Sequence, residues 1–156
     1  MSLPLLKRVL TGDADAIEAF GDGEICAVID WRAGLPEMAE EIAAKLPDGH
    51  FKIIRSTAEE VVVQVGSRTQ ETVPVTPEAK QEELLLRLDG LLHPEYEMRQ
   101  FRPFDGDSYS LYIAEAKTWA ALDHENGEAL EKYFLPIPRL AAYWKKGYFA
   151  RLFSKP

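Results

Sequence analysis

Strand-like segments of this chain come in pairs separated by short turns, and this pairing constrains the fold more than any other feature. Residues 60–65 and 69–75 are rich in valine and threonine and flank a turn at 66–68, which predicts a hairpin. Residues 96–102 and 109–114 predict a second hairpin, because the loop between them is rich in turn-forming residues. Strands joined in hairpins are antiparallel, so we expect a mostly antiparallel sheet.

Two further segments predict strands and bring the expected sheet to five or six strands. Residues 24–31 are apolar on both faces, which is typical of a strand in the centre of a sheet. Residues 50–56 predict another strand after the turn at Pro47-Asp48-Gly49.

Helices are predicted on both sides of these strands. Asp13 is a candidate N-cap for a short helix that ends near Phe20, and Thr76-Pro77 combines a capping hydroxyl with proline at the first helical position. The other expected helices span residues 2–12, 35–46, 117–125, 128–134 and 138–153, and the one that starts at Thr76-Pro77 runs to Leu92. We therefore expect one α+β domain over residues 1–156, with helices on one face of the sheet and a helical C-terminal third.

Composition is typical of a globular protein from a reducing compartment. Its 156 residues suit one domain, and 46% hydrophobic content is ordinary for a folded chain. The single cysteine, Cys26, rules out an internal disulfide and a multi-cysteine zinc site, and its apolar surroundings predict a buried, inert thiol. The sequence contains no bilayer-spanning apolar run and no signal-peptide pattern, so we expect a soluble cytoplasmic protein.

Charge is distributed unevenly along the chain. The first 131 residues contain 12 Lys and Arg against 26 Asp and Glu, whereas residues 132–156 contain six basic side chains and no acidic one. The formal net charge of −8 disfavours nucleic acid as a ligand, because such binding depends on neutralising phosphates with Lys and Arg. An acidic body instead attracts a basic partner, although the charge can also serve solubility alone.

The C-terminal helix is the best candidate for a partner-binding surface. Residues 132–156 contain seven of the chain's 16 aromatic side chains, and they lie on more than one side of the expected helix. The candidate contact residues are Tyr143, Trp144, Lys146, Tyr148, Phe149 and Phe153. Two alternatives remain: the helix docks fully onto the domain, or it lies on an anionic membrane, which the net charge disfavours.

An acidic pair followed by Glu-x-Lys suggests an alternative function. Asp105 and Asp107 precede a predicted strand that ends in Glu115-Ala116-Lys117, and metal-dependent nucleases combine such carboxylates with a lysine. The competing interpretation is a turn with solvated carboxylates, followed by a helix start. No arrangement of the cysteine or the three histidines predicts a metal site, and no motif predicts a cofactor.

Asp30 and Trp31 end the first predicted strand and are candidate pocket residues, because polar side chains at strand ends often line binding sites. Alternatively, Asp30 turns the chain before residues 32–34. A serine hydrolase is not supported by Gly106-Asp107-Ser108, since the only later histidine, His124, lacks the Asp-x-x-His spacing.

The segment Thr118-Trp119-Ala120-Ala121-Leu122, then Gly127, then residues 133–137, resembles the C-terminal signature of a family of uncharacterised small acidic bacterial proteins. The resemblance covers the last third of the chain and implies a bacterial α+β domain without an assigned activity. Our first hypothesis is a non-enzymatic module that binds a protein or a second copy of itself, in the manner of an antitoxin or immunity protein. The alternatives are a metal-dependent hydrolase and a peripheral membrane protein.

Overall fold

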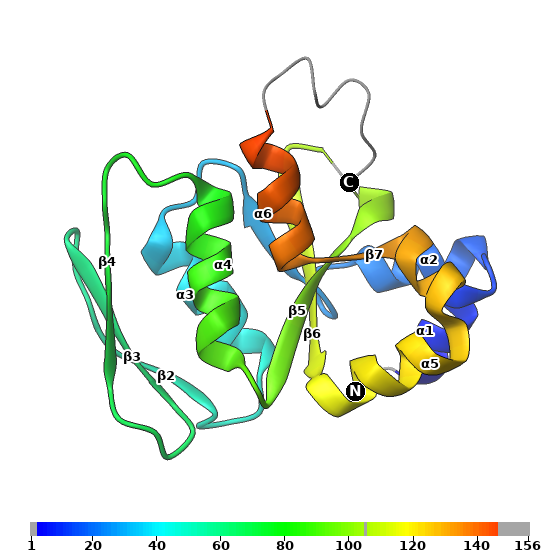
Figure 1. Cartoon of the computed structure of the whole chain (residues 1–156), viewed down its shortest axis with the longest axis horizontal. Helices are drawn as coiled ribbons and strands as arrows, with labels where there is room; N and C mark the ends of the chain where they lie inside the picture. The colour runs from blue at the N-terminus through cyan, green and yellow to red at the C-terminus, as the bar shows by residue number, and fades with distance from the viewer. Residues whose placement is uncertain (1–2, 105, 147–156) are drawn as a thin grey trace.

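A computed structural model describes residues 3–104 and 106–146 of the chain, and within them it forms an α+β domain (Figure 1). The strands are β1 Ala27–Asp30, β2 Phe51–Ser56, β3 Glu60–Val65, β4 Glu71–Pro74, β5 Tyr96–Phe101, β6 Ser108–Glu115 and β7 Phe134–Pro136. The helices are α1 Leu3–Leu10, α2 Ala14–Gly21, α3 Leu35–Lys45, α4 Gln81–Leu92, α5 Ala116–Tyr133 and α6 Ile137–Lys145, with a short 3₁₀ turn at Arg102–Phe104. The expected fold class is confirmed.

The strands form two sheets, both antiparallel. The central sheet has the order β1-β6-β5-β7, and a second sheet has the order β2-β3-β4. Both predicted hairpins are present, as the β3–β4 and β5–β6 pairs. The strands were expected in one sheet; instead, the second sheet lies at one end of the molecule with α3 and α4 between it and the central strands (Figure 1).

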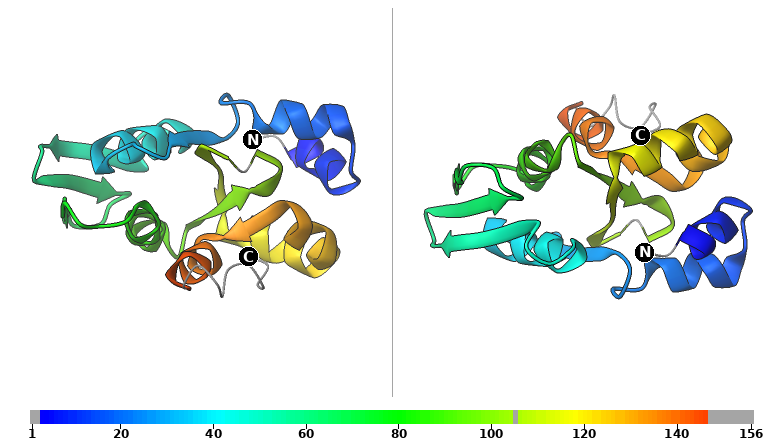
Figure 2. Two further views of the ribbon diagram at one scale, coloured as in Figure 1. Left: turned by 90° about the horizontal axis from the view of Figure 1, so that it is seen from above. Right: turned by 90° about the horizontal axis from the view of Figure 1, so that it is seen from below.

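Both faces of the central sheet are covered, which corrects the expectation of helices on one face only. On β6, Leu111 and Ile113 enter a core that includes α3, α4 and the second sheet, whereas Tyr112 and Ala114 enter a core with α1, α2 and α5. Side chains alternate between the faces of a strand, so one strand contributes to both cores. In Figure 2, α3 and α4 lie on one side of the central strands, and α1, α2 and α5 lie on the other side.

Two strand assignments differ from the sequence expectation. β1 was expected in the centre of the sheet, but it lies at the edge, and its Val28 side chain is 38% exposed. β7 was not expected: Phe134 was predicted as the end of a helix and residues 135–138 as a break, but Phe134 and Leu135 pair with Phe101 and Gln100 of β5. A three-residue strand is too short for a periodic pattern to reveal it.

Helix ends follow local capping signals only in part. Asp13 caps α2 as expected, since its side chain accepts a hydrogen bond from the Ala16 amide at 3.1 Å. Thr76-Pro77 does not start α4; a turn follows, and the helix begins at Gln81. The Gln81 Nε2 atom donates to the carbonyl oxygens of Asp30 (3.0 Å) and Ala33 (2.9 Å), so a tertiary contact holds this helix start.

Cys26 is buried, as expected, and its Sγ atom lies 3.3 Å from the Phe20 carbonyl oxygen. Burial raises the pKa of this thiol to about 12. Because the thiolate is the reactive species, we expect Cys26 to react with a thiol reagent such as DTNB at pH 8 at least about a hundredfold more slowly in the native protein than in denaturant. Equal rates in the two conditions would show that the thiol is accessible.

Candidate functional site

The structure does not bring together the four residues of the hydrolase hypothesis. Asp107 precedes β6 and Glu115 ends it, so the length of the strand, about 25 Å, separates them. Glu115 forms an ion pair with Lys117 at 2.6 Å instead. Asp105 lies outside the described residues. Within residues 3–104 and 106–146, no group of three His, Cys, Asp or Glu side chains is arranged to hold a metal ion.

Asp30 and Trp31 lie at a turn that follows β1. The Asp30 carboxylate accepts a hydrogen bond from the Arg32 amide at 2.7 Å, which is the turn-forming role of the alternative interpretation. The Trp31 side chain is 54% exposed, and the Arg32 guanidinium lies 5.0 Å from the centre of its ring. Trp31 therefore presents a broad aromatic surface to solvent.

The described part of the C-terminal segment contains one exposed aromatic side chain. Trp144 is 37% exposed on α6 and lies next to Tyr143, with 5.6 Å between the ring centres. Lys146 is exposed just after the helix. The remaining candidate contact residues lie outside the described residues: Tyr148, Phe149 and Phe153. The same face of α6 is partly docked, because Leu140 and Ala141 are buried.

Trp31 and Trp144 lie near the same helix end. The backbone on either side of Trp31 contacts Gln81 in the first turn of α4, and Trp144 contributes to a small depression together with Lys80 and Glu83. We call this surface, formed by Trp31, Trp144 and residues 80–83, the tryptophan end. Two segments that sequence analysis considered separately thus both lie near the start of α4.

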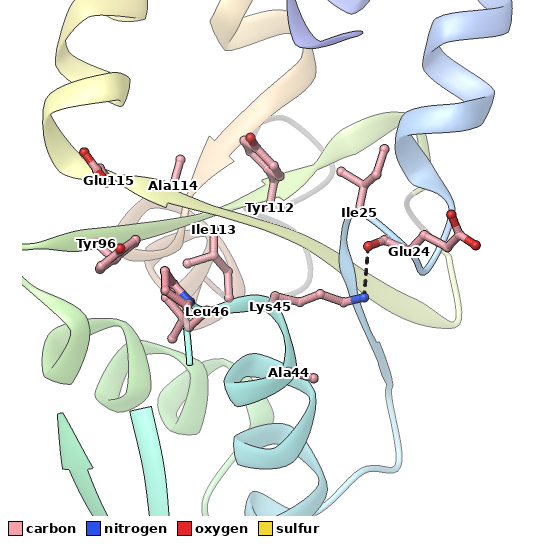
Figure 3. A pocket seen from close by; sticks show the side chains of 11 residues that line it. Glu24, Ile25, Ala44, Lys45, Leu46, Tyr96, Tyr112, Ile113, Ala114 and Glu115 are labelled. Atoms are coloured by element: carbon pink, nitrogen blue, oxygen red, sulfur yellow. Dashed lines mark hydrogen bonds between the residues drawn. The ribbon is translucent and has the colours of Figure 1, made fainter. Parts of the chain in front are cut away.

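A second candidate site is a groove of about 710 Å³ beside the C-terminal half of β6 (Figure 3). Its floor is formed by residues 112–115 of β6, and its walls by the end of α3 and the turn before β1, including Glu24, Ile25 and Lys45. We call it the β6 groove. The volume lies within the range of small-molecule and peptide sites.

The walls of the β6 groove are held together by Lys45. Its ammonium group donates to the carbonyl oxygens of Gly23 and Glu24, and this bridge joins the end of α3 to the turn before β1 (Figure 3). No motif in the sequence marks the groove, because its residues come from four separate segments.

The comparisons with known proteins add no relative: no protein-family model, no curated protein and no solved structure matches the chain. Among the described helices, none combines the length and the apolar composition that crossing a bilayer requires.

Proposed function

We propose that the protein is a binding module for another protein and that the tryptophan end forms part of its contact surface. The observation that carries this proposal is the exposure of Trp31 and Trp144 beside the first turn of one helix. Tryptophan is the residue type most enriched among side chains that dominate binding energy, and exposed tryptophans in one region are uncommon on a surface that contacts only water.

Charge supports a basic partner for such a module. The chain has a net charge of −8, and an acidic protein attracts cationic proteins over a distance of about 10 Å at moderate salt. An antitoxin-like or immunity-like role would be one form of this function, because such proteins block basic toxins. The metal-dependent hydrolase has less support, because the length of β6 separates Asp107 from Glu115.

Substitution of Trp31 tests this function. We expect a partner captured from a bacterial lysate by the wild-type protein to be lost, by about tenfold or more, on the Trp31→Ala variant, because a central tryptophan contributes about 2 kcal/mol or more to binding. The identified partner is then purified and its affinity for both proteins is measured by calorimetry.

Ile54→Ala is the matched control, since Ile54 is 46% exposed but lies on β2 in the second sheet, away from the tryptophan end. Both variants should retain the wild-type circular dichroism spectrum, because neither side chain is buried. Equal affinity of the partner for wild type and Trp31→Ala would contradict the proposed surface.

A further inference from the structure

The edge strand β1 covers only half of its neighbour in the central sheet. Its four residues pair with residues 108–111 of β6, which is eight residues long. Before β1, the chain lies outside the sheet in a tight turn, in which the amides of Ile25 and Cys26 donate to the Asp22 carbonyl oxygen at 3.0 and 3.3 Å. Among the described strands, residues 112–115 consequently pair on one side only, with β5.

Two hydrogen bonds establish which way the backbone groups of β6 point. The Trp31 amide donates to the Asp107 carbonyl at 3.1 Å, so odd-numbered residues of β6 direct their backbone groups toward the β1 side. The Ala116 amide donates to the Glu95 carbonyl at 2.9 Å, so even-numbered residues point toward β5. Since this direction alternates along a strand, the N–H and C=O groups of Ile113 and Glu115 point into the β6 groove.

At the opposite edge of the sheet, a side chain pairs with the backbone amide that lies beyond the end of a short strand. β7 ends its pairing at Arg99 of β5, and the next amide on that side, that of Met98, donates to the buried Asp89 carboxylate at 2.8 Å. No described side chain does the same for Ile113 or Glu115. Unpaired backbone groups in a recessed groove are costly, so their partner is either water or an arriving main chain.

We propose that the β6 groove binds an extended, cationic segment of a partner protein, which adds a strand to β6 through the backbone groups of Ile113 and Glu115. Only an extended main chain offers donors and acceptors at the roughly 7 Å repeat that separates these two residues. This site lies beyond the tryptophan end and does not depend on it.

The charges around the groove favour a basic segment. The Glu24 carboxylate lies at the rim and forms no ion pair with a described residue, while the Lys45 ammonium is occupied by two backbone carbonyl groups. Among the described residues, the Glu115 carboxylate at the other end forms an ion pair with Lys117 alone, and the Lys117 side chain is highly exposed. A Lys or Arg in the bound segment would therefore meet a carboxylate at either end of the groove.

Proline at position 115 removes one of these backbone donors without disturbing the fold. Glu115 has φ −58°, which proline requires, and its N–H points away from β5. Glu115→Ala is the matched control, because it removes the same carboxylate but keeps the N–H group. The probe is a fluorescently labelled peptide of alternating Val and Lys residues, and its binding is followed by anisotropy.

We expect the peptide to bind Glu115→Pro about tenfold more weakly than Glu115→Ala, since one backbone hydrogen bond is lost and the proline ring obstructs the edge. Trp31→Ala should bind the peptide as tightly as the wild type, which separates this site from the proposed tryptophan surface. Equal binding by the two position-115 variants, or no binding by the wild type, would overturn the proposal.

A second measurement uses the unaltered protein and so does not depend on how the proline variant folds. Peptides that are N-methylated at alternate residues lose the donors of one edge only. Two peptides are compared, one methylated at its odd-numbered residues and the other at its even-numbered residues. One of them should not bind, and the affinity of the other should stay within about twofold of the unmethylated peptide, because a strand pairs through one edge. An equal loss of affinity for the two methylated peptides would indicate attraction by charge alone and would also overturn the proposal.

Discussion

Replacement of Trp119 by alanine is expected to destabilise the protein by about 4 kcal/mol, which is a large part of the 5–15 kcal/mol that holds a domain folded. Trp119 is fully buried where α5 packs against the central sheet. Its ring lies 5.4 Å from that of Phe134 and 5.7 Å from that of Tyr112. Truncation therefore removes the largest buried side chain of this core and leaves a cavity.

Trp119 also contributes two polar contacts that alanine cannot replace. Its Nε1 atom donates to the Glu97 carbonyl at 2.9 Å, and the Arg99 guanidinium lies 4.4 Å from its ring centre. Urea denaturation followed by circular dichroism measures the loss. Trp31→Ala is the control and should change the free energy of unfolding by less than about 0.5 kcal/mol, because Trp31 is exposed. Similar losses for both variants would contradict the packing described for Trp119.

Replacement of Asp89 by alanine is expected to cost about 3 kcal/mol. The Asp89 side chain is buried, and its carboxylate accepts the Met98 amide hydrogen bond that closes the end of the β5–β7 pairing. Alanine leaves that amide unpaired in the interior and adds a small cavity. Asp89→Asn keeps an oxygen that can accept the bond, so we expect it to remain within about 1 kcal/mol of the wild type at pH 7.

The difference in stability between the wild type and Asp89→Asn is expected to depend on pH. Burial raises the pKa of the Asp89 carboxyl, against the opposing effects of the Met98 hydrogen bond and of His93. Between the ordinary Asp pKa and this raised value, the folded state holds a proton that the unfolded state releases, so the stability contributed by Asp89 falls as pH rises. The wild type should gain stability relative to Asp89→Asn as pH falls from 7 to 4; a constant difference would contradict the raised pKa.

Local sequence signals predicted those elements that depend on neighbours in the chain. Asp13 caps α2 because the cap is a contact within four residues, and the hairpins follow from turns between valine-rich segments. The wrong assignments depend on distant contacts. The start of α4 is determined by Gln81 bonding the turn after β1, and the edge position of β1 follows from a sheet order that no local pattern encodes.

The candidate sites also combine features that the local sequence predicts with features that depend on distant contacts. Sequence analysis identified Trp31 as a candidate pocket residue and Trp144 as a candidate contact residue, but their common location near one end of α4 required the structure. The β6 groove was missed because nothing in the sequence shows where β1 stops pairing. Two of the candidate metal-binding carboxylates, Asp107 and Glu115, do not come together, because the length of β6 lies between them.

The alternation of β6 between two cores has a further consequence. A slip of one residue in its pairing with β5 would push Tyr112 into the space of an aliphatic side chain and, at the same time, withdraw an aromatic ring from the helices on the other side. The packing on each face of the sheet would therefore disfavour the slipped pairing, so both cores stabilise the native register of β6 with β5. A change in the pairing of β6 with β5 would therefore disturb the side-chain packing on both faces of the central sheet.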